Sequence, residues 1–151
     1  MNIGDKIPAV LGKDQNGKEI KAEDFKGRKL VLYTYPKDNT SGCTAEACSL
    51  RDHKDELAAQ GYAILGVSKD SAASHQKFIE KQALNFDLIA DVETELLQAL
   101  GAWGEKKMCG KTTVGTLRTT YLVNDEGVIT HIFTPKQINT KEHAEQILKV
   151  L

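Results

Sequence analysis

Hydrophobic residues recur along this chain with two periods, which predict alternating strands and helices. Compact runs rich in β-branched and aromatic residues predict strands over 29–35, 62–68, 86–90, 117–123 and 128–133. Apolar residues at helical spacing predict helices over 44–60, 71–84, 91–101 and 139–151. We expect these helices to bury Ala47, Leu50, Leu57, Ala58, Phe78, Ile79, Ala83, Leu96, Leu97, Leu100, Ala144, Ile147, Leu148 and Leu151.

Turn-forming residues mark where the chain reverses. The pair Asn16-Gly17 separates the apolar segment Val10-Leu11 from Lys18–Ile20, so we expect an N-terminal β-hairpin. The run Asn-Asp-Glu-Gly at 124–127 predicts a second hairpin between the last two strands. The stretch 104–115 mixes lysine, glycine and threonine without an apolar period, and this predicts a loop.

The order of elements predicts the fold class. Strands that alternate with helices, followed by a hairpin and a closing helix, indicate an α/β protein with a central mixed sheet and helices on both faces. A thioredoxin-like topology is the natural candidate. Right-handed crossovers would place residues 36–43 beyond the carboxyl end of a central strand, where open α/β sheets usually hold their sites.

Length and charge limit the class of protein. With 151 residues the chain suits one hydrophobic core, so we expect a single domain over 1–151. The 20 basic and 21 acidic side chains give a net charge of -1, which argues against generic nucleic-acid binding. The longest apolar runs, at 30–33 and 62–67, are too short to span a bilayer. We therefore expect a cytoplasmic protein with no membrane partner.

Two of the three cysteines, Cys43 and Cys48, lie five residues apart at the predicted start of a helix. A thiol at a helix N-terminus lies among unpaired backbone N–H groups and the positive end of the helix dipole, which favours the thiolate. Cys43 is therefore a candidate nucleophile. The alternative is that both cysteines are small buried hydrophobic residues.

The segment 36–43, Pro-Lys-Asp-Asn-Thr-Ser-Gly-Cys, fits the Pro-x-x-x-Thr-x-x-Cys signature of peroxiredoxins. The chain resembles the bacterioferritin comigratory protein or peroxiredoxin Q branch of that family over nearly its full length. The resemblance extends to the N-terminal hairpin and to 66–71, 74–78, 106–108 and 118–123. It implies a thioredoxin-like fold and a thiol-dependent peroxidase that reduces hydrogen peroxide and organic hydroperoxides.

The resemblance assigns a role to each residue of the motif. Cys43 is the peroxidatic nucleophile, whose thiolate cleaves the peroxide O–O bond and becomes a sulfenic acid. The Thr40 hydroxyl, the N–H groups of Gly42 and Cys43 and the Arg118 guanidinium would donate hydrogen bonds to the two oxygens. Pro36 would cover the thiolate. Without the resemblance, Arg118 is a surface ion-pairing residue, Thr40 a turn or cap residue and Pro36 a strand terminator.

Cys48 matches the resolving cysteine that some members of this branch carry five residues after the first. On a regular helix, five residues rise about 7.5 Å and separate the two Cα atoms by roughly 8 to 9 Å on different faces. A disulfide tolerates no more than about 7 Å between Cα atoms. The first helical turns must therefore unwind before Cys48 can attack the sulfenic acid of Cys43.

The resemblance also implies the partners. Thioredoxin is the expected reductant, and no haem, flavin or metal is needed because the thiol carries the two-electron chemistry. The chain has no cysteine-bearing tail after Cys109, so we expect a monomer with Cys109 as a bystander thiol. Cys109 and Ser41 stand where relatives often carry tyrosine and proline. Glu46, in the first helical turn, has at most a supporting role.

Two alternatives belong to other classes of protein. Cys43, Cys48 and His53 are spaced by fives and could form a zinc-binding module, but steps of five fan out around a helix. The second alternative is a thioredoxin-like protein-disulfide oxidoreductase or a redox-responsive binding protein, whose usual Cys-x-x-Cys motif this sequence lacks. His53 and His75 fit solvated helical positions outside the motif.

Overall fold

The computed structural model describes residues 1–108 and 110–151, with Met108 described in its backbone alone. Cys109, which the sequence analysis interprets as a bystander thiol, lies outside the described residues. In the described part of the chain, no helix has the length and apolar character needed to cross a membrane.

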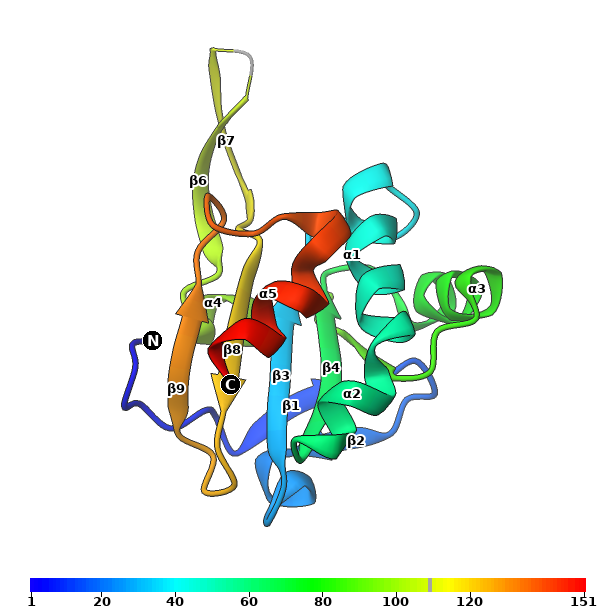
Figure 1. Cartoon of the computed structure of the whole chain (residues 1–151). Coiled ribbons are helices and arrows are strands. Elements are labelled where there is room, and N and C mark those ends of the chain that lie inside the picture. The colour runs from blue at the N-terminus through cyan, green and yellow to red at the C-terminus, as the bar shows by residue number, and fades with distance from the viewer. Residues whose placement is uncertain (109) are drawn as a thin grey trace.

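A five-stranded mixed sheet forms the centre of the molecule (Figure 1). Its strands lie in the order β5 (Asp87–Ala90), β4 (Tyr62–Ser68), β3 (Lys29–Thr34), β8 (Thr119–Val123) and β9 (Ile129–Phe133). The pairs β3–β4 and β4–β5 are parallel, while β3–β8 and β8–β9 are antiparallel. This confirms the predicted mixed sheet, and each predicted strand end falls within two residues of the observed one.

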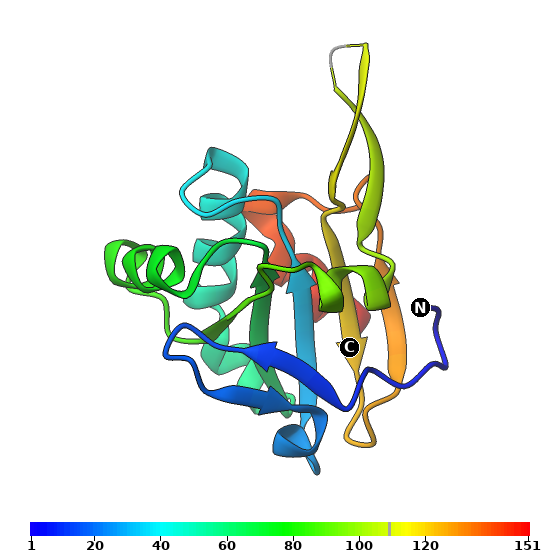
Figure 2. The same cartoon turned by 180° about the vertical axis from the view of Figure 1, so that it is seen from behind.

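The central strand β3 contributes to two hydrophobic cores because its side chains alternate between the two faces of the sheet. Val31 and Tyr33 pack in the core beneath the helical layer, whereas Leu30 and Leu32 pack in the core on the other face. The first core is covered by α1 (Ser41–Asp52), α2 (Lys54–Ala59), α3 (Ala72–Gln82) and α5 (His143–Val150). The N-terminal hairpin and α4 (Glu95–Leu100) cover the second, as Figure 2 shows from behind.

The predicted N-terminal hairpin is confirmed. Its strands β1 (Val10–Lys13) and β2 (Glu19–Lys21) are antiparallel, and the short helix η1 (Ala22–Phe25) follows them. In the turn, the Asp14 carboxylate accepts hydrogen bonds from the N–H groups of Asn16 at 2.8 Å and Lys18 at 3.0 Å. Gly17 takes a φ of 78°, which glycine adopts at little cost.

The helix that carries both cysteines is interrupted, so the prediction of one continuous helix over 44–60 is wrong. Helix α1 begins earlier, at Ser41, and ends at Asp52, after which His53 leaves the helical conformation with φ -110° and ψ 14°. The Nδ1 atom of His53 lies 2.8 Å from the carbonyl oxygen of Ser49, so its side chain contacts the helix backbone at the break. Helix α2 then ends at Ala59, and Gly61, the predicted stop, follows with a φ of 86°. Leu57 is buried as predicted, but Ala58 is exposed, so the prediction that it is buried is wrong.

The helix α3 begins as predicted and ends earlier. The Ser71 hydroxyl caps it by accepting a hydrogen bond from the N–H of Ser74 at 3.2 Å. Ala83 adopts a left-handed conformation with φ 50°, and the chain turns so that Leu84 is buried in its place. The expectation that Ala83 faces inward is therefore wrong: it is exposed.

The predicted cap of α4 is confirmed, although this helix begins four residues after it. The Asp91 carboxylate accepts hydrogen bonds from the N–H groups of Leu96 at 3.2 Å and Leu97 at 2.7 Å. Gly101 ends the helix with a φ of 81°.

The last helix is preceded by a short helix, η2 (Thr140–Glu142), where the Asn139 side chain accepts from the N–H of Lys141 at 3.2 Å. Ala144 and Ile147 are buried as predicted. Leu151 lies beyond the end of α5 and is 43% exposed, so the prediction that it is buried is wrong.

Residues 104–115 do not form the predicted loop. They belong to an antiparallel hairpin, β6 (Trp103–Met108) and β7 (Lys111–Thr116), which projects from the body of the molecule (Figure 1). We call this hairpin the arm. Residues 111–114 are exposed in succession, so this part of β7 has no buried face and shows no apolar alternation.

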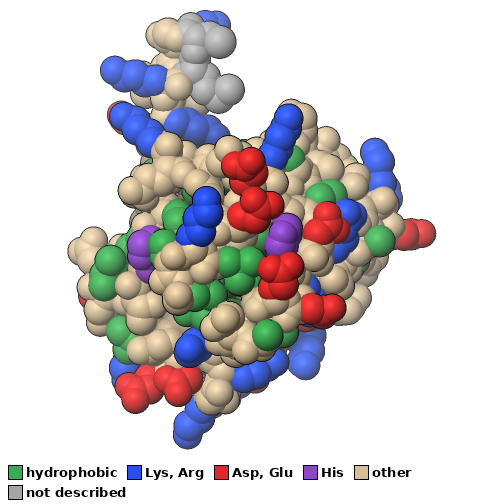
Figure 3. Space-filling view, viewed as in Figure 1, with side chains coloured by type: hydrophobic (Ala, Val, Ile, Leu, Met, Phe, Trp, Pro, Cys, Tyr) green, Lys and Arg blue, Asp and Glu red, His purple; other side chains and the backbone are tan. Residues whose placement is uncertain are grey.

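Charges on the face that carries α1 and α5 are mixed (Figure 3). Acidic and basic side chains are interspersed there, and lysines 106, 107 and 111 lie on the arm. Among the described residues on that face, the charges do not form the continuous basic stripe that is typical of nucleic-acid binding.

A buried polar network ties the loop after β3 to helix α3. Its centre is Asp38, whose carboxylate accepts from Tyr35 Oη at 2.6 Å and from Ser74 Oγ at 2.8 Å. The same carboxylate lies 2.7 Å from Nδ1 of His75, and the Asp38 N–H donates to Asp70 at 2.9 Å. His75 is fully buried, so the expectation that it occupies a solvated position is wrong.

The contact between Asp38 and His75 joins a buried carboxylate to a buried imidazole. The other ring nitrogen of His75 lies 2.8 Å from the carbonyl oxygen of Ile89, which can only accept. Burial opposes ionisation of Asp38, but the hydrogen bonds from His75 and Tyr35 outweigh it and lower the pKa of this carboxyl. Both ring nitrogens of His75 therefore lie beside an acceptor, which fixes the orientation of the ring.

Replacing His75 by alanine should destabilise the protein by about 3–5 kcal/mol, because it leaves the buried Asp38 carboxylate without its partner. Urea unfolding at neutral pH measures the change. In the parent, the lowered pKa of Asp38 contributes stability above the pKa of the unfolded carboxyl, and this contribution is lost as the pH falls through the folded pKa.

The matched control is His53→Ala, since His53 is partly exposed and lies 3.8 Å from Glu145. This substitution should lower the free energy of unfolding by about 1 kcal/mol or less. Equal losses in the two variants would show that the buried pair contributes no more than the surface pair.

Candidate active site

The start of α1 is built where the chain leaves the carboxyl end of β3. Thr40 precedes the helix with an extended backbone, and its carbonyl accepts the first helical hydrogen bond from the N–H of Thr44 at 2.9 Å. Its hydroxyl donates to the Lys37 carbonyl at 2.8 Å and does not cap the helix. Pro36 is half-buried at the beginning of this loop. Within the described part of the chain, the first turn of α1 therefore has no side-chain cap for its backbone N–H groups.

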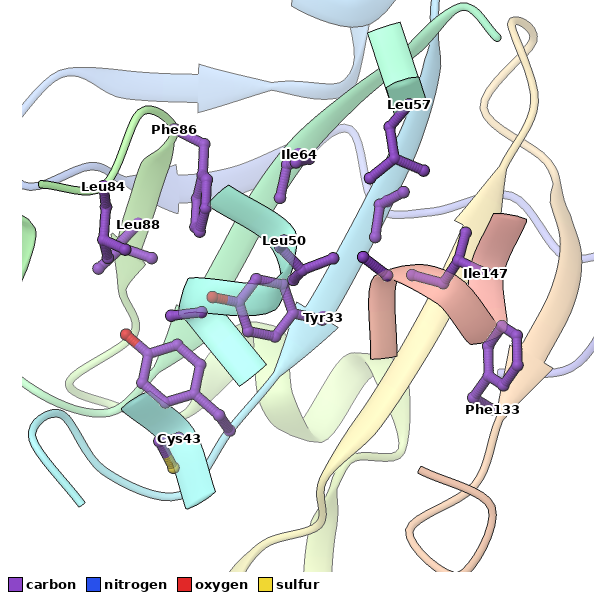
Figure 4. Packing of buried hydrophobic residues seen from close by; sticks show 14 of the residues in the cluster. Tyr33, Cys43, Leu50, Leu57, Ile64, Leu84, Phe86, Leu88, Phe133 and Ile147 are labelled. Carbon is purple, nitrogen blue, oxygen red and sulfur yellow. The ribbon is translucent and has the colours of Figure 1, made fainter. Parts of the chain in front are cut away.

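Cys43 lies in that first turn and is 1% exposed. It forms the edge of the core beneath the helical layer, and Figure 4 shows its sulfur beyond the aromatic side chains of that core. Its sulfur lies 3.4 Å from Nη2 of Arg118. The structure thus brings two of the sequence-predicted site residues into direct contact.

Arg118 is held in place by the end of β3. The Thr34 hydroxyl donates to the carbonyl of Leu117 at 2.8 Å and accepts from the N–H of Thr119 at 3.1 Å. Both neighbours of Arg118 in the chain are thus fixed to the strand that leads to Cys43. Burial lowers the pKa of Arg118, but Glu46 and Cys43 outweigh it and raise that pKa above its ordinary value.

Gly42 leaves room for this arrangement. A Cβ atom at this position would lie 3.3 Å from Nη2 of Arg118, closer than most such contacts. The glycine in the motif therefore permits the guanidinium to approach the first turn of α1.

Glu46 binds the other side of the guanidinium. Its Oε1 atom accepts from Nη1 of Arg118 at 2.7 Å, and the side chain is fully buried. Burial outweighs the attraction of Arg118 and raises the pKa of Glu46 to about 7. The Oε2 atom has no hydrogen-bond partner among the described residues.

A histidine from α5 completes the surroundings of Glu46. Nε2 of His143 lies 3.8 Å from Oε2 of Glu46 and 2.7 Å from the Thr120 hydroxyl, while Nδ1 lies 3.0 Å from Oε1 of Gln146. Burial lowers the pKa of His143 to about 4, so the ring is neutral near neutral pH. The positive charge of Arg118 lowers the pKa of His143 in the same direction.

Cys48 faces away from this cluster. Its sulfur lies 3.6 Å from Oε1 of Gln82, on α3, and the side chain is partly exposed. Both cysteines are free thiols. The two side chains on α1 therefore contact different elements, as expected for a step of five residues on a helix.

The residues of the zinc alternative do not converge. Cys43 contacts Arg118, Cys48 contacts Gln82, and the His53 ring lies between the Ser49 carbonyl and Glu145. Within the described residues, no group of three His, Cys, Asp or Glu side chains is placed to hold a metal ion.

Part of this cluster was not predicted from the sequence. Glu46 follows Cys43 by three residues and so lies on the same face of α1, a spacing that could have identified it as the partner of Arg118. His143 and Thr120 are far from the motif in the chain, and no local signal marked them. Their place depends on how α5 packs over β8.

Comparisons with known proteins agree with this geometry. The model of the AhpC/TSA family matches residues 3–132. The chain is 39% identical over 151 residues to a putative peroxiredoxin bcp of Haemophilus influenzae, covering 100% of this chain and 96% of that protein. It is 40% identical to peroxiredoxin Bcp of Bacillus subtilis, covering 100% of this chain and 95% of that one.

Solved structures give the same result. The bacterioferritin comigratory protein of Xanthomonas campestris, solved in trapped intermediate and ligand complexes, superimposes with a TM-score of 0.87 at 32% identity, covering 99% of this chain and 96% of that one. A cysteine mutant of peroxiredoxin Q from Xylella fastidiosa gives a TM-score of 0.89 at 31% identity, with 99% and 94% covered. The thioredoxin-like α/β fold is confirmed, and the chain belongs to the AhpC/TSA family as a peroxiredoxin of the Bcp or peroxiredoxin Q branch.

Proposed function

We propose that this peroxiredoxin reduces hydrogen peroxide and organic hydroperoxides with Cys43 as its peroxidatic nucleophile. The contact that carries the proposal is the 3.4 Å approach of Arg118 Nη2 to the Cys43 sulfur in the first turn of α1. A guanidinium and a helix N-terminus both favour a thiolate over a thiol. The Xanthomonas campestris relative is described in terms of alkyl peroxide reduction, which supports the same substrate class here.

The chemistry follows from the donors around the sulfur. The Cys43 thiolate attacks one peroxide oxygen, an S–O bond forms and the O–O bond breaks, and the second oxygen leaves as hydroxide or alkoxide. Arg118 and the N–H groups of Gly42 and Cys43 stabilise the developing charge. The Thr40 hydroxyl, which donates to the Lys37 carbonyl in this structure, turns toward the peroxide when substrate binds. Pro36 covers the Cys43 thiolate and limits the access of water to it.

Resolution follows at the other cysteine. The Cys48 thiol attacks the sulfur of the Cys43 sulfenic acid, an S–S bond forms, and water leaves. The first turns of α1 unwind for this step because the two side chains contact different elements. The Asp38 network before the helix and the break at His53 after it are the natural limits of the unwound segment.

Thioredoxin is the proposed reductant of the resulting disulfide. An intramolecular bond between two residues of one helix needs no second subunit, which supports a monomer. Cysteine usage typical of a reducing compartment supports a cytoplasmic location.

The first test separates the two cysteines. Cys43→Ser should abolish peroxide consumption, whereas Cys48→Ser should react once and stall as a sulfenic acid, with its mass raised by one oxygen atom. Steady-state assays coupled to thioredoxin should show no turnover for either variant, and intact-mass measurement after one equivalent of peroxide should distinguish them. Insulin reduction, measured in parallel, tests the alternative of a general disulfide oxidoreductase.

Cys109→Ser is the control for this pair and should turn over like the parent. If the Cys109→Ser variant reacted with peroxide but showed no thioredoxin-coupled turnover, Cys109 and not Cys48 would be the resolving cysteine. Normal turnover by Cys43→Ser would remove the proposed nucleophile.

The second test removes the guanidinium. Arg118→Ala should slow attack on peroxide by about 100-fold or more, the usual effect of deleting a donor that stabilises charge in the transition state. Arg118→Lys should recover part of the rate, because an ammonium restores the charge without the planar fork that contacts both Cys43 and Glu46. Stopped-flow rates at fixed pH measure both, and an alanine variant as fast as the parent would place Arg118 outside the reaction.

The third test follows the helix. Oxidation to the Cys43–Cys48 disulfide should remove amide-exchange protection from about residue 43 to residue 51, while β3 and β4 keep theirs. The slow unwinding also leaves time for a second peroxide to over-oxidise Cys43 at high dose. An oxidised protein that contains this disulfide and retains full protection in α1 would exclude resolution by unwinding.

A further inference from the structure

The site places two acids on a single cation. Cys43 and Glu46 lie three residues apart on one face of α1 and contact different nitrogens of Arg118, at 3.4 Å and 2.7 Å. The other titratable groups that face Glu46 are Tyr33 of β3 and His143 of α5. Burial raises the pKa of Tyr33, and burial lowers that of His143, so both are neutral near pH 7. Among the described groups facing Glu46, Arg118 alone carries positive charge.

The free oxygen of Glu46 has the surroundings of a carboxylic acid. Oε2 is buried and has no hydrogen-bond partner among the described residues, which is costly for an ionised oxygen. Its neighbour at 3.8 Å is Nε2 of His143. A proton on Oε2 would neutralise the carboxylate, so that no negative charge is left on this buried oxygen.

The tautomer of His143 supports the same state. Oε1 of Gln146 already accepts from the N–H of Asn139 at 2.9 Å, so it is an acceptor, and Nδ1 of His143 must donate to it. The neutral ring then has its lone pair on Nε2, which accepts from the Thr120 hydroxyl at 2.7 Å. Nε2 therefore has no N–H to offer to Oε2 of Glu46 at 3.8 Å, and an ionised Oε2 would lack a donor among the described residues.

We propose that Cys43 and Glu46 share one proton across Arg118, with Glu46 holding it while Cys43 is the thiolate and releasing it when Cys43 becomes a neutral sulfenic acid. This inference rests on the proposed function of Cys43. Glu46 acts through Arg118 and the shared charge and does not touch the peroxide.

The step balances without an outside proton. Written in full, Cys43–S⁻, Glu46–COOH and R–OOH give Cys43–SOH, Glu46–COO⁻ and R–OH, where R is hydrogen or an alkyl group. The thiolate supplies two electrons to the O–O bond, the leaving oxygen takes up the proton lost by Glu46, and the total charge around Arg118 stays constant. One anion remains beside the partly buried guanidinium before and after the reaction.

The experiment counts protons in a protein that stops at the sulfenic acid. Cys48→Ser is oxidised by one equivalent of hydrogen peroxide in weak buffer containing a pH indicator, at a pH below the value of about 7 at which Glu46 titrates. Thiolate absorbance before the addition shows that Cys43 is ionised. The expected proton uptake is zero for Cys48→Ser, and about one per molecule when Glu46→Gln is added, because the amide has no proton to release.

Glu145→Gln in the same background is the matched control, since it removes an exposed carboxylate from α5 and should leave the uptake at zero. Uptake of one proton by Cys48→Ser itself would overturn the shared proton, as would zero uptake with Glu46→Gln. Zero uptake without thiolate absorbance would assign the proton to Cys43 and overturn the inference as well.

A second readout keeps the inference testable if the amide perturbs packing. Glu46→Gln should keep its thiolate absorbance to a lower pH than the parent, because the competitor for Arg118 is gone, and exchange protection of α1 should be unchanged. Failure to form a sulfenic acid in Cys48→Ser would instead refute the proposed function, and intact mass separates that result from a failure of the proton count alone.

Discussion

The contact between Arg118 and Cys43 is the interaction on which the rest of the site depends. A thiolate in a 1% exposed position needs a nearby cation, because burial of an isolated charge is costly. The guanidinium fulfils this need through one nitrogen and holds Glu46 through another. Its fork shape matters for this reason, since a single ammonium cannot present two separate donors in fixed directions.

The fold delivers these groups from elements that are distant in the chain. Thr34, at the end of β3, fixes the peptides on both sides of Arg118, while the loop that follows the same strand leads into α1. The buried contact between Asp38 and His75 anchors that loop to α3. Cys43 and Arg118 are thus both positioned by the carboxyl end of one central strand, which is buried on both faces of the sheet.

The sequence was sufficient for the parts of the molecule that local pattern controls. The central strands, the caps at Ser71 and Asp91 and the pairing of Cys43 with Arg118 could be predicted from periodicity, turn chemistry and the motif. The break at His53 and the burial of His75 could not, because each depends on tertiary contacts. The arm was missed for a different reason: a hairpin with polar faces carries no apolar alternation to detect.

The arm also divides the molecule into parts under different constraints. Residues of the two cores must fit their neighbours, and Gly42 must stay small beside Arg118. Residues 111–114 are exposed in succession and bury little surface on the body of the protein. Substitutions there change charge and shape without cost to the cores, so this hairpin can diversify during evolution while the packing around Cys43 is kept.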